Sequence, residues 1–194
     1  DVFKPYSEEE MKAKRAELLE TFKYNYSEDR VVTNGPIWEY VEDRDKENKW
    51  EDYRVVSNEN MYDDATAYSI AVINDADDMY GNADPDNSHL VIDEIFDWVS
   101  PEANKDGLVA VGYDDGRTNY LNITTGKYIS DNWFVFDKTT YNRAGWRISN
   151  APIMDEAGVI IKELDGTYNI LMPNGERTLK DLKTYNPIER LKFG

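Results

Sequence analysis

Cysteine is absent from this chain of 194 residues, and histidine occurs once, at position 89. Without cysteine the protein has neither disulfide bonds nor thiolate metal ligands. Long apolar runs are also missing, since segments such as 70–73 and 133–136 contain only a few residues, whereas a membrane-spanning helix needs about 20. We therefore expect no membrane insertion.

Basic side chains are few, because 22 Lys and Arg stand against 39 Asp and Glu and leave a formal charge of −17. Nucleic-acid affinity depends on Lys and Arg that neutralise phosphates, so we expect no nucleic-acid partner. Hydrophobic residues still make up 40% of the chain, which is enough for a folded core. An acidic surface instead favours another protein, or a divalent cation, as the partner.

The first 26 residues predict one amphipathic helix. Ser7 and Glu10 have the spacing of a capping box at its start. The apolar stripe of this helix consists of Met11, Leu18, Leu19, Phe22 and Tyr26. A stripe this narrow is typical of a helix that packs on its own domain, and we expect that packing here.

After Tyr26 the sequence becomes a series of short runs rich in Val, Ile, Tyr and Trp, separated by clusters of Asn, Asp and Gly. This pattern is typical of strands and turns. The predicted strands are 37–41, 53–56, 68–73, 89–96, 108–113, 118–123, 133–136, 145–148, 158–163 and 168–172. Asp115-Gly116 and Asp165-Gly166 each lie between two such runs, which predicts hairpin turns.

Two internal alignments indicate a degenerate repeat. A shift of 38 residues places 93–96 on 131–134, and also Gly107 on Gly145. A second alignment starts from Gly107 and Gly158, and it pairs Gly116 with Gly166, Asn119 with Asn169 and Gly126 with Gly175. Each repeat unit is a hairpin that cannot bury its face alone, so neighbouring hairpins must stack to form a core.

We therefore predict a mainly β fold with a minor α component, made of stacked antiparallel hairpin repeats with one N-terminal amphipathic helix. Residues 1–26 form the helix, packed on the main domain. Residues 27–92 form an irregular β-rich segment with an acidic loop. Residues 93–194 form the hairpin repeats.

The repeat resembles the WG-repeat family, whose unit runs from a glycine through an apolar strand and a turn to W-G-Y-I-D and then G-K. The matching stretches are 117–122 followed by Gly126-Lys127, and 168–171 followed by Asn174-Gly175-Glu176. The signature Trp-Gly is replaced by Thr118-Asn119 and Tyr168-Asn169. The resemblance covers roughly residues 93–182. Such proteins occur in bacteria and phages, and the resemblance implies a β-rich binding or structural module without known catalytic residues.

One acidic stretch matches a metal-binding template. Counted from Asn82, the residues Asn82, Asp84, Asp86, Ser88 and Asp93 occupy positions 1, 3, 5, 7 and 12 of a calcium-binding loop. Position 6 is Asn87 where the template has Gly, and position 12 is Asp where it has Glu. A calcium site at Asn82, Asp84, Asp86 and Asp93 is one interpretation, and a solvated turn is the other. His89 is interpreted as a strand-edge side chain rather than a metal ligand.

Known catalytic signatures do not occur in the sequence, which contains no G-x-S-x-G, no phosphate-binding loop and no H-E-x-x-H. We expect a non-enzymatic module, without a cofactor apart from the candidate calcium ion, that mediates protein-protein contact. Among the aromatic residues, Phe96, Trp98, Trp133 and Phe134 are predicted in the core, and Trp146 is a candidate partner-binding residue.

Two settings fit this interpretation. One is a phage particle or a phage-infected bacterial cell. The other is a secreted or envelope-associated bacterial protein whose signal peptide has been removed, since the chain begins at Asp1. The alternative function is a carbohydrate-active or metal-assisted hydrolase that uses acidic residues near 75–97, because glycoside hydrolysis needs only two suitably placed carboxyl groups.

Overall fold

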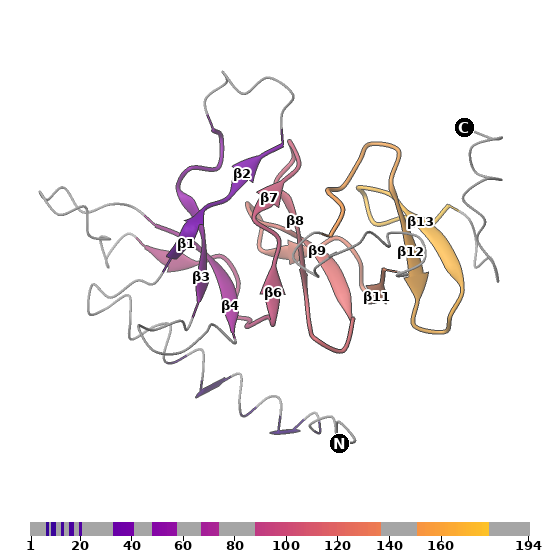
Figure 1. The fold of residues 1–194 in the computed structure, drawn as a ribbon, viewed down its shortest axis with the longest axis horizontal. Helices are drawn as coiled ribbons and strands as arrows, with labels where there is room; N and C mark the ends of the chain where they lie inside the picture. Colours follow the sequence, from indigo (N-terminus) through magenta and orange to yellow (C-terminus); the bar gives the residue numbers. More distant parts are fainter. Residues whose placement is uncertain are drawn as a thin grey trace, which may run out of the picture. The chain divides into compact units, whose positions relative to one another are not determined.

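The structure is a computed structural model that describes residues 33–40, 48–57, 67–73, 88–136 and 151–178, with scattered positions between 7 and 20. The chain divides into two compact units. The first comprises Asp1–Ile37 and Trp50–Asp97, and the second Trp38–Lys49 and Trp98–Gly194. The described part is mainly β and consists largely of antiparallel hairpins, as the sequence predicts (Figure 1).

The N-terminal segment is described at seven positions, and residues 9, 10, 13, 16, 17 and 20 have helical backbone with exposed side chains. The predicted capping box forms: the Glu10 amide donates to Ser7 Oγ at 3.2 Å, and the Ser7 amide donates to Glu10 Oε2 at 3.3 Å. The apolar stripe lies outside the described residues, so the packing of this segment stays a prediction. No helix within the described ranges is long and apolar enough to cross a membrane.

The first unit contains a four-stranded antiparallel sheet in the order β1-β3-β4-β5. Its strands are β1 (Thr33–Pro36), β3 (Tyr53–Ser57), β4 (Tyr68–Val72) and β5 (His89–Leu90). Apolar residues of β3, of β4 and of the positions that flank β4 reach a small core, which consists of Val56, Ala67, Ala71, Ile73 and Ile95 with Leu90 packed against it. β-branched residues favour such pleated, half-buried strands.

The predicted strand 89–96 is wrong as a single element. β5 ends at Leu90, the Val91 amide still donates to Ile70 O at 2.8 Å, and residues 91–93 then bend before Phe96 pairs with Tyr68. Leu90 pairs with Ala71, and Phe96 pairs with Tyr68. Phe96 lies six positions after Leu90, whereas their partners in β4 are only three positions apart. The extra residues are left out of the ladder as a bulge, and the acidic pair Asp93-Glu94 lies within it.

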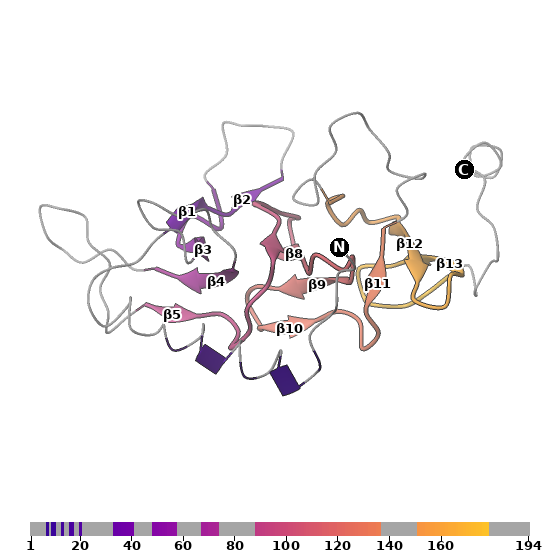
Figure 2. The ribbon, with the colours of Figure 1, turned by 60° about the horizontal axis from the view of Figure 1, so that its bottom comes forward.

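The second unit contains a seven-stranded sheet in the order β13-β12-β11-β9-β8-β6, with β10 also paired to β9 (Figure 2). Its strands are β6 (Trp98–Val99), β8 (Leu108–Gly112), β9 (Thr118–Asn122), β10 (Lys127–Tyr128), β11 (Phe134–Val135), β12 (Val159–Glu163) and β13 (Tyr168–Leu171). A separate parallel pair joins β2 (Trp38–Glu39) to β7 (Glu102–Ala103). The short strands β1, β6, β7 and β10 were not predicted.

The hairpins β8–β9 and β12–β13 have the same backbone hydrogen bonds around their turns. The Tyr113 amide donates to Arg117 O at 3.0 Å, and the Glu163 amide donates to Thr167 O at 2.7 Å. Gly116 and Gly166 have φ of 98° and 91°, a conformation that favours glycine. A shift of 50 residues therefore maps the register and the turn of one hairpin onto those of the other, which confirms the predicted pairing of Gly116 with Gly166.

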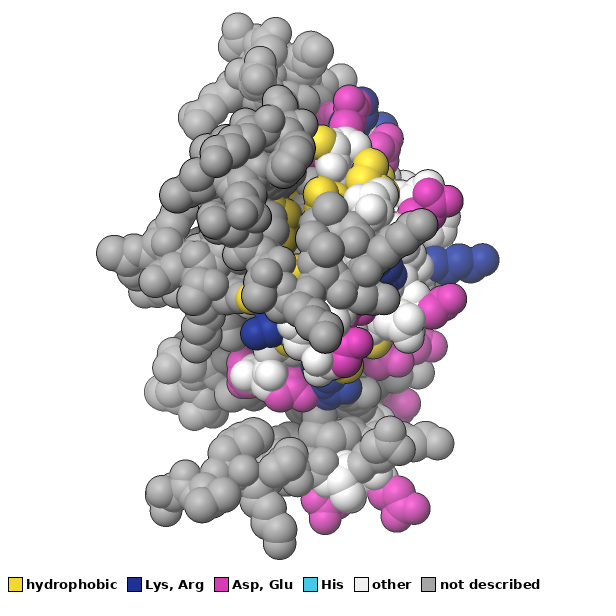
Figure 3. Space-filling view, turned by 90° about the vertical axis from the view of Figure 1, so that its right-hand side faces the viewer, with side chains coloured by type: hydrophobic (Ala, Val, Ile, Leu, Met, Phe, Trp, Pro, Cys, Tyr) yellow, Lys and Arg dark blue, Asp and Glu magenta, His cyan; other side chains and the backbone are white. Residues whose placement is uncertain are grey.

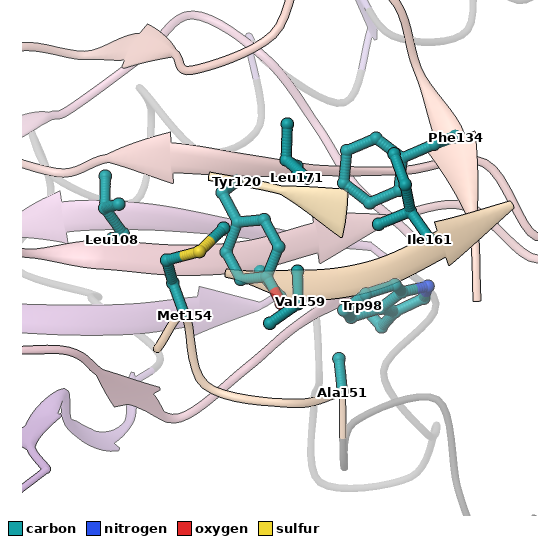
Figure 4. Packing of buried hydrophobic residues seen from close by; sticks show 10 residues of the cluster. Trp98, Leu108, Tyr120, Phe134, Ala151, Met154, Val159, Ile161 and Leu171 are labelled. Carbon is teal, nitrogen blue, oxygen red and sulfur yellow. The ribbon is translucent and has the colours of Figure 1, made fainter. Parts of the chain in front are cut away.

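The two hairpins stack through one hydrophobic core. Its buried members are Trp98, Leu108, Ala110, Tyr120, Phe134, Ala151, Met154, Val159, Ile161 and Leu171. Figure 4 shows these side chains converging from both hairpins and from β6 and β11. Phe134 is central to the stack because β11 pairs with β9 on one side and with β12 on the other. The predicted stacking of hairpins is confirmed.

Candidate functional site

The predicted calcium loop lies largely outside the described residues, which include neither Asn82 nor Asp84 nor Asp86. Asp93 is described, and its side chain is exposed in the bulge after β5. Within the described ranges, no three His, Cys, Asp or Glu residues are grouped closely enough to hold a metal ion. The calcium site stays a prediction. His89 is exposed in β5, at the edge of its sheet.

The aromatic residues separate into core and surface groups. Phe96, Trp98 and Phe134 are buried, as predicted. Trp133 is only half-buried and lies against two tyrosines rather than in the core. Trp146, the candidate partner-binding residue, lies outside the described residues, so its role stays a prediction. Acidic residues of the alternative hydrolase are described only from Asp93 onward.

Within the described part of the chain, exposed aromatic side chains belong to β2 and the residue that follows it. Among the described residues, the exposed large hydrophobic side chains are Trp38 (54%), Tyr40 (58%) and Leu164 (61%). Trp38 and Tyr40 are two residues apart in an extended segment, so both side chains project from the same face. We call Trp38 and Tyr40 the aromatic face.

Hydrogen bonds of the backbone amides hold the aromatic face in place. The Trp38 amide donates to Pro101 O at 3.1 Å, and the Tyr40 amide donates to Ala103 O at 2.8 Å. The intervening amide of Glu39 donates to Asn48 Oδ1 at 3.3 Å. The two exposed rings are therefore carried by a backbone that is anchored on both edges.

The neighbouring strand β7 places a carboxylate beside the aromatic face. Glu102 is exposed and pairs in parallel register with Trp38, while Ala103 pairs with Glu39 and is fully buried. The Glu102 amide donates to Ser100 Oγ at 3.5 Å. Because residues in register on neighbouring strands lie on the same face of a sheet, the Glu102 side chain leaves the sheet on the same side as Trp38.

The first hairpin carries a cluster of aromatic rings next to its turn. Trp133 lies 5.4 Å from Tyr113 and 5.1 Å from Tyr128, measured between ring centroids. The guanidinium of Arg117 lies 5.0 Å from the Tyr113 ring centroid and donates from Nε to Asp115 Oδ2 at 2.7 Å. The Arg117 guanidinium thus occupies one face of the Tyr113 ring.

The second hairpin has a polar network at the corresponding place. Arg177 donates from Nε to Glu163 Oε1 at 3.0 Å, from Nη1 to Ser130 Oγ at 2.7 Å and from Nη2 to Asn132 O at 3.1 Å. Asn169 Nδ2 also donates to Glu163 Oε1, at 3.4 Å. Because Ser130 and Asn132 follow the first hairpin, the network ties the two hairpins together.

Among the described residues, two exposed groups have shifted pKa values. The hydrogen bond and the charge of Glu156 raise the pKa of Lys105 above its ordinary value. The Thr167 hydroxyl donates to Asp165 Oδ1 at 2.6 Å and the Thr167 amide donates at 2.9 Å, and these bonds lower the pKa of Asp165. Lys105 lies in the turn before β8, and Asp165 lies in the turn between β12 and β13.

Figure 3 shows more Asp and Glu than Lys and Arg on the described part of the face it presents.

Sequence reasoning did not select the aromatic face. Trp38 and Tyr40 lie in the predicted strand 37–41, and their alternation with Ile37 and Glu39 was a usable signal, because period-two alternation places them on one face. Glu102 had no such signal, since its place beside Trp38 depends on the pairing of β2 with a strand 64 positions further along. Comparison with known proteins finds no matching family model, no matching curated protein and no matching solved structure.

Proposed function

We propose that this protein is a non-enzymatic, WG-repeat-like binding or structural module that contacts another protein through the aromatic face. The observation that carries the proposal is the exposure of Trp38 and Tyr40, 54% and 58%, on an anchored strand. Trp and Tyr are, with Arg, enriched at the centres of protein interfaces, where a rigid ring gains contact area at little entropic cost.

The repeat architecture supports the same proposal. Stacked hairpins with a shared core give a firm support, on which a short pair such as β2 and β7 can present side chains to a partner. The hydrogen-bond equivalence of the two hairpins supports a repeat origin of the C-terminal half. A phage particle or a bacterial envelope remains the proposed setting, because the WG-repeat resemblance favours it.

Site-specific photo-crosslinking tests the proposal. A benzoylphenylalanine residue is placed at Trp38, and a matched one at Thr125, which is exposed in the turn between β9 and β10. Both proteins are irradiated in extract of the bacterial cells that contain the natural chain, and the adducts are identified by mass spectrometry. We expect one protein to be captured from position 38, not from position 125, and to be lost when Tyr40→Ser is added. Identical adducts at both positions would contradict the proposal.

A further inference from the structure

The surface around the aromatic face combines rings with a carboxylate, and this combination has a definite chemical preference. The faces of Trp and Tyr rings carry negative electrostatic potential, which attracts ammonium and guanidinium groups. Glu102 pairs with Trp38 in the β2–β7 register and is exposed on the same side. Rings and carboxylate therefore favour the same kind of ligand group, a cation.

Within the described part of the chain, no Lys or Arg forms an ion pair with Glu102. The ion pairs between described residues join Lys105 to Glu156, Arg117 to Asp115 and Arg177 to Glu163, and none includes Glu102. Lys49, which belongs to the same unit, donates from Nζ to the Lys105 carbonyl oxygen at 3.1 Å. Within the described part of the chain, the Glu102 carboxylate thus keeps its charge available to a partner.

We infer that Trp38, Tyr40 and Glu102 bind an extended segment of a partner protein that carries Lys or Arg at alternate positions. This inference rests on the proposed function and specifies its partner. Trp38 and Tyr40 are about 6.6 Å apart along the strand, the spacing of alternate side chains in an extended chain. The net charge of −17 attracts a basic segment. The same charge repels a second copy of this chain, which makes self-association the disfavoured occupant.

A binding titration with a defined probe tests the inference. The probe is a fluorescein-labelled peptide of six Lys-Ser repeats, and the matched negative probe has six Glu-Ser repeats. Fluorescence anisotropy is measured with the full chain at low and at physiological salt. The variants are Trp38→Ser/Tyr40→Ser, Glu102→Gln and, as a control that removes one exposed negative charge elsewhere, Asp131→Asn.

We expect the Lys-Ser probe alone to bind. Glu102→Gln should weaken it about two- to fivefold and the aromatic double variant about tenfold, whereas Asp131→Asn should change affinity less than twofold. Equal affinities for all variants would mean diffuse charge attraction and would overturn the inference. Concentration-dependent dimerisation that the double variant abolishes would also overturn it, by identifying a second copy as the occupant.

The two proposals fail separately. A partner captured by crosslinking from position 38, together with no binding of the Lys-Ser probe, overturns the basic-segment inference and leaves the proposed function in place. Absence of a position-specific adduct, together with no probe binding, overturns both.

Discussion

The hairpins β8–β9 and β12–β13 share a turn, a register and an inter-strand hydrogen-bond pattern, yet they place opposite chemistry at equivalent positions. Tyr113 of the first hairpin corresponds to Glu163 of the second, each three residues before the turn glycine. Tyr128 and Arg177 are likewise equivalent, since they pair with Leu121 and Leu171. An aromatic cluster in one hairpin is therefore an ionic network in the other.

The hairpins also differ in which face they bury. Val159 and Leu171 belong to the shared core, but their equivalents Val109 and Leu121 lie on the opposite side of β8–β9 from the core residue Leu108. β8 is buried along its whole length, whereas on the side of β12–β13 away from the core Ile160 is buried but Lys162, Tyr168 and Ile170 are only half-buried. The two hairpins thus share their backbone geometry. The position of each hairpin in the stack determines which of its two faces is buried, and therefore which residues each face can have.

The largest expected difference between the hairpins comes from truncating one equivalent pair. Tyr120 is fully buried, stacks on Phe134 at 6.2 Å and donates its hydroxyl to Pro152 O at 2.5 Å, whereas its equivalent Ile170 is half-buried. We expect Tyr120→Ala to lower the free energy of unfolding by about 3 to 5 kcal/mol, and Ile170→Ala by about 1 to 2 kcal/mol. Urea unfolding followed by circular dichroism measures both. Equal losses of stability would show that Tyr120 and Ile170 are equally well packed, and would contradict this difference between the hairpins.

A second pair contrasts close packing with open surface. A Cβ atom at Gly112 would meet Trp98 Cε2 at 2.6 Å and Arg117 O at 2.7 Å, whereas the equivalent Lys162 is half-exposed. Gly112→Val should therefore destabilise the protein by about 2 to 3 kcal/mol, and Lys162→Val by no more than about 0.5 kcal/mol. Thermal unfolding curves of the two variants give the comparison. A stable Gly112→Val protein would contradict the packing of Trp98 on this strand.

The two arginines sharpen the contrast between the networks. The side chains of Arg177 and Glu163 are 20% and 15% exposed, against 40% and 45% for Arg117 and Asp115. Arg177→Met should cost about 2 kcal/mol, because it leaves the half-buried Glu163 without its cation. Arg117→Met should cost at most about 0.5 kcal/mol. Urea unfolding of both variants, at low and at high salt, measures the two losses of stability. Similar losses would contradict the role of Arg177 in tying the two hairpins together.

The smallest effect concerns the turn of the second hairpin. Hydrogen bonds from Thr167 lower the pKa of Asp165, so Thr167→Val should raise this pKa toward its ordinary value of about 3.9. A lowered pKa in the folded state stabilises the fold above the unfolded-state pKa, and this stabilisation is lost as the pH falls through the folded-state value. Carbon-13 NMR titration of the Asp165 carboxyl measures the shift. An unchanged or lower pKa in the variant would contradict the assignment.

Local sequence patterns predicted the hairpins, because a hairpin is specified by residues that are close together in the sequence. Alternating apolar residues and the Asp-Gly turns placed β8, β9, β12 and β13 within about one residue of their observed bounds. Buried Asn119 and Asn169 were correctly paired as equivalents, and they occupy matching register positions opposite Val111 and Ile161.

Non-local pairings could not be predicted in this way. β6 and β7 have two residues each, and they exist because of partners elsewhere in the chain: Gly112 and Val111 for β6, and β2 for β7. The bulge between Leu90 and Phe96 depends on the number of residues between two contacts with β4, which periodicity does not reveal. The Arg177 network was also missed, because its members lie up to 47 positions apart.

Tryptophan indole NMR with the Lys-Ser peptide tests most directly the central claim that the hairpin stack is a support and the aromatic face is the recognition surface. The chain contains five tryptophans, so nitrogen-15 labelling gives one indole signal for each, assigned with Trp→Phe variants. We predict that the Trp38 signal shifts with added peptide, while the signals of buried Trp98 and half-buried Trp133 stay in place. Shifts at Trp133 or Trp98 with an unchanged Trp38 would contradict the account, because recognition would then lie on the hairpins themselves.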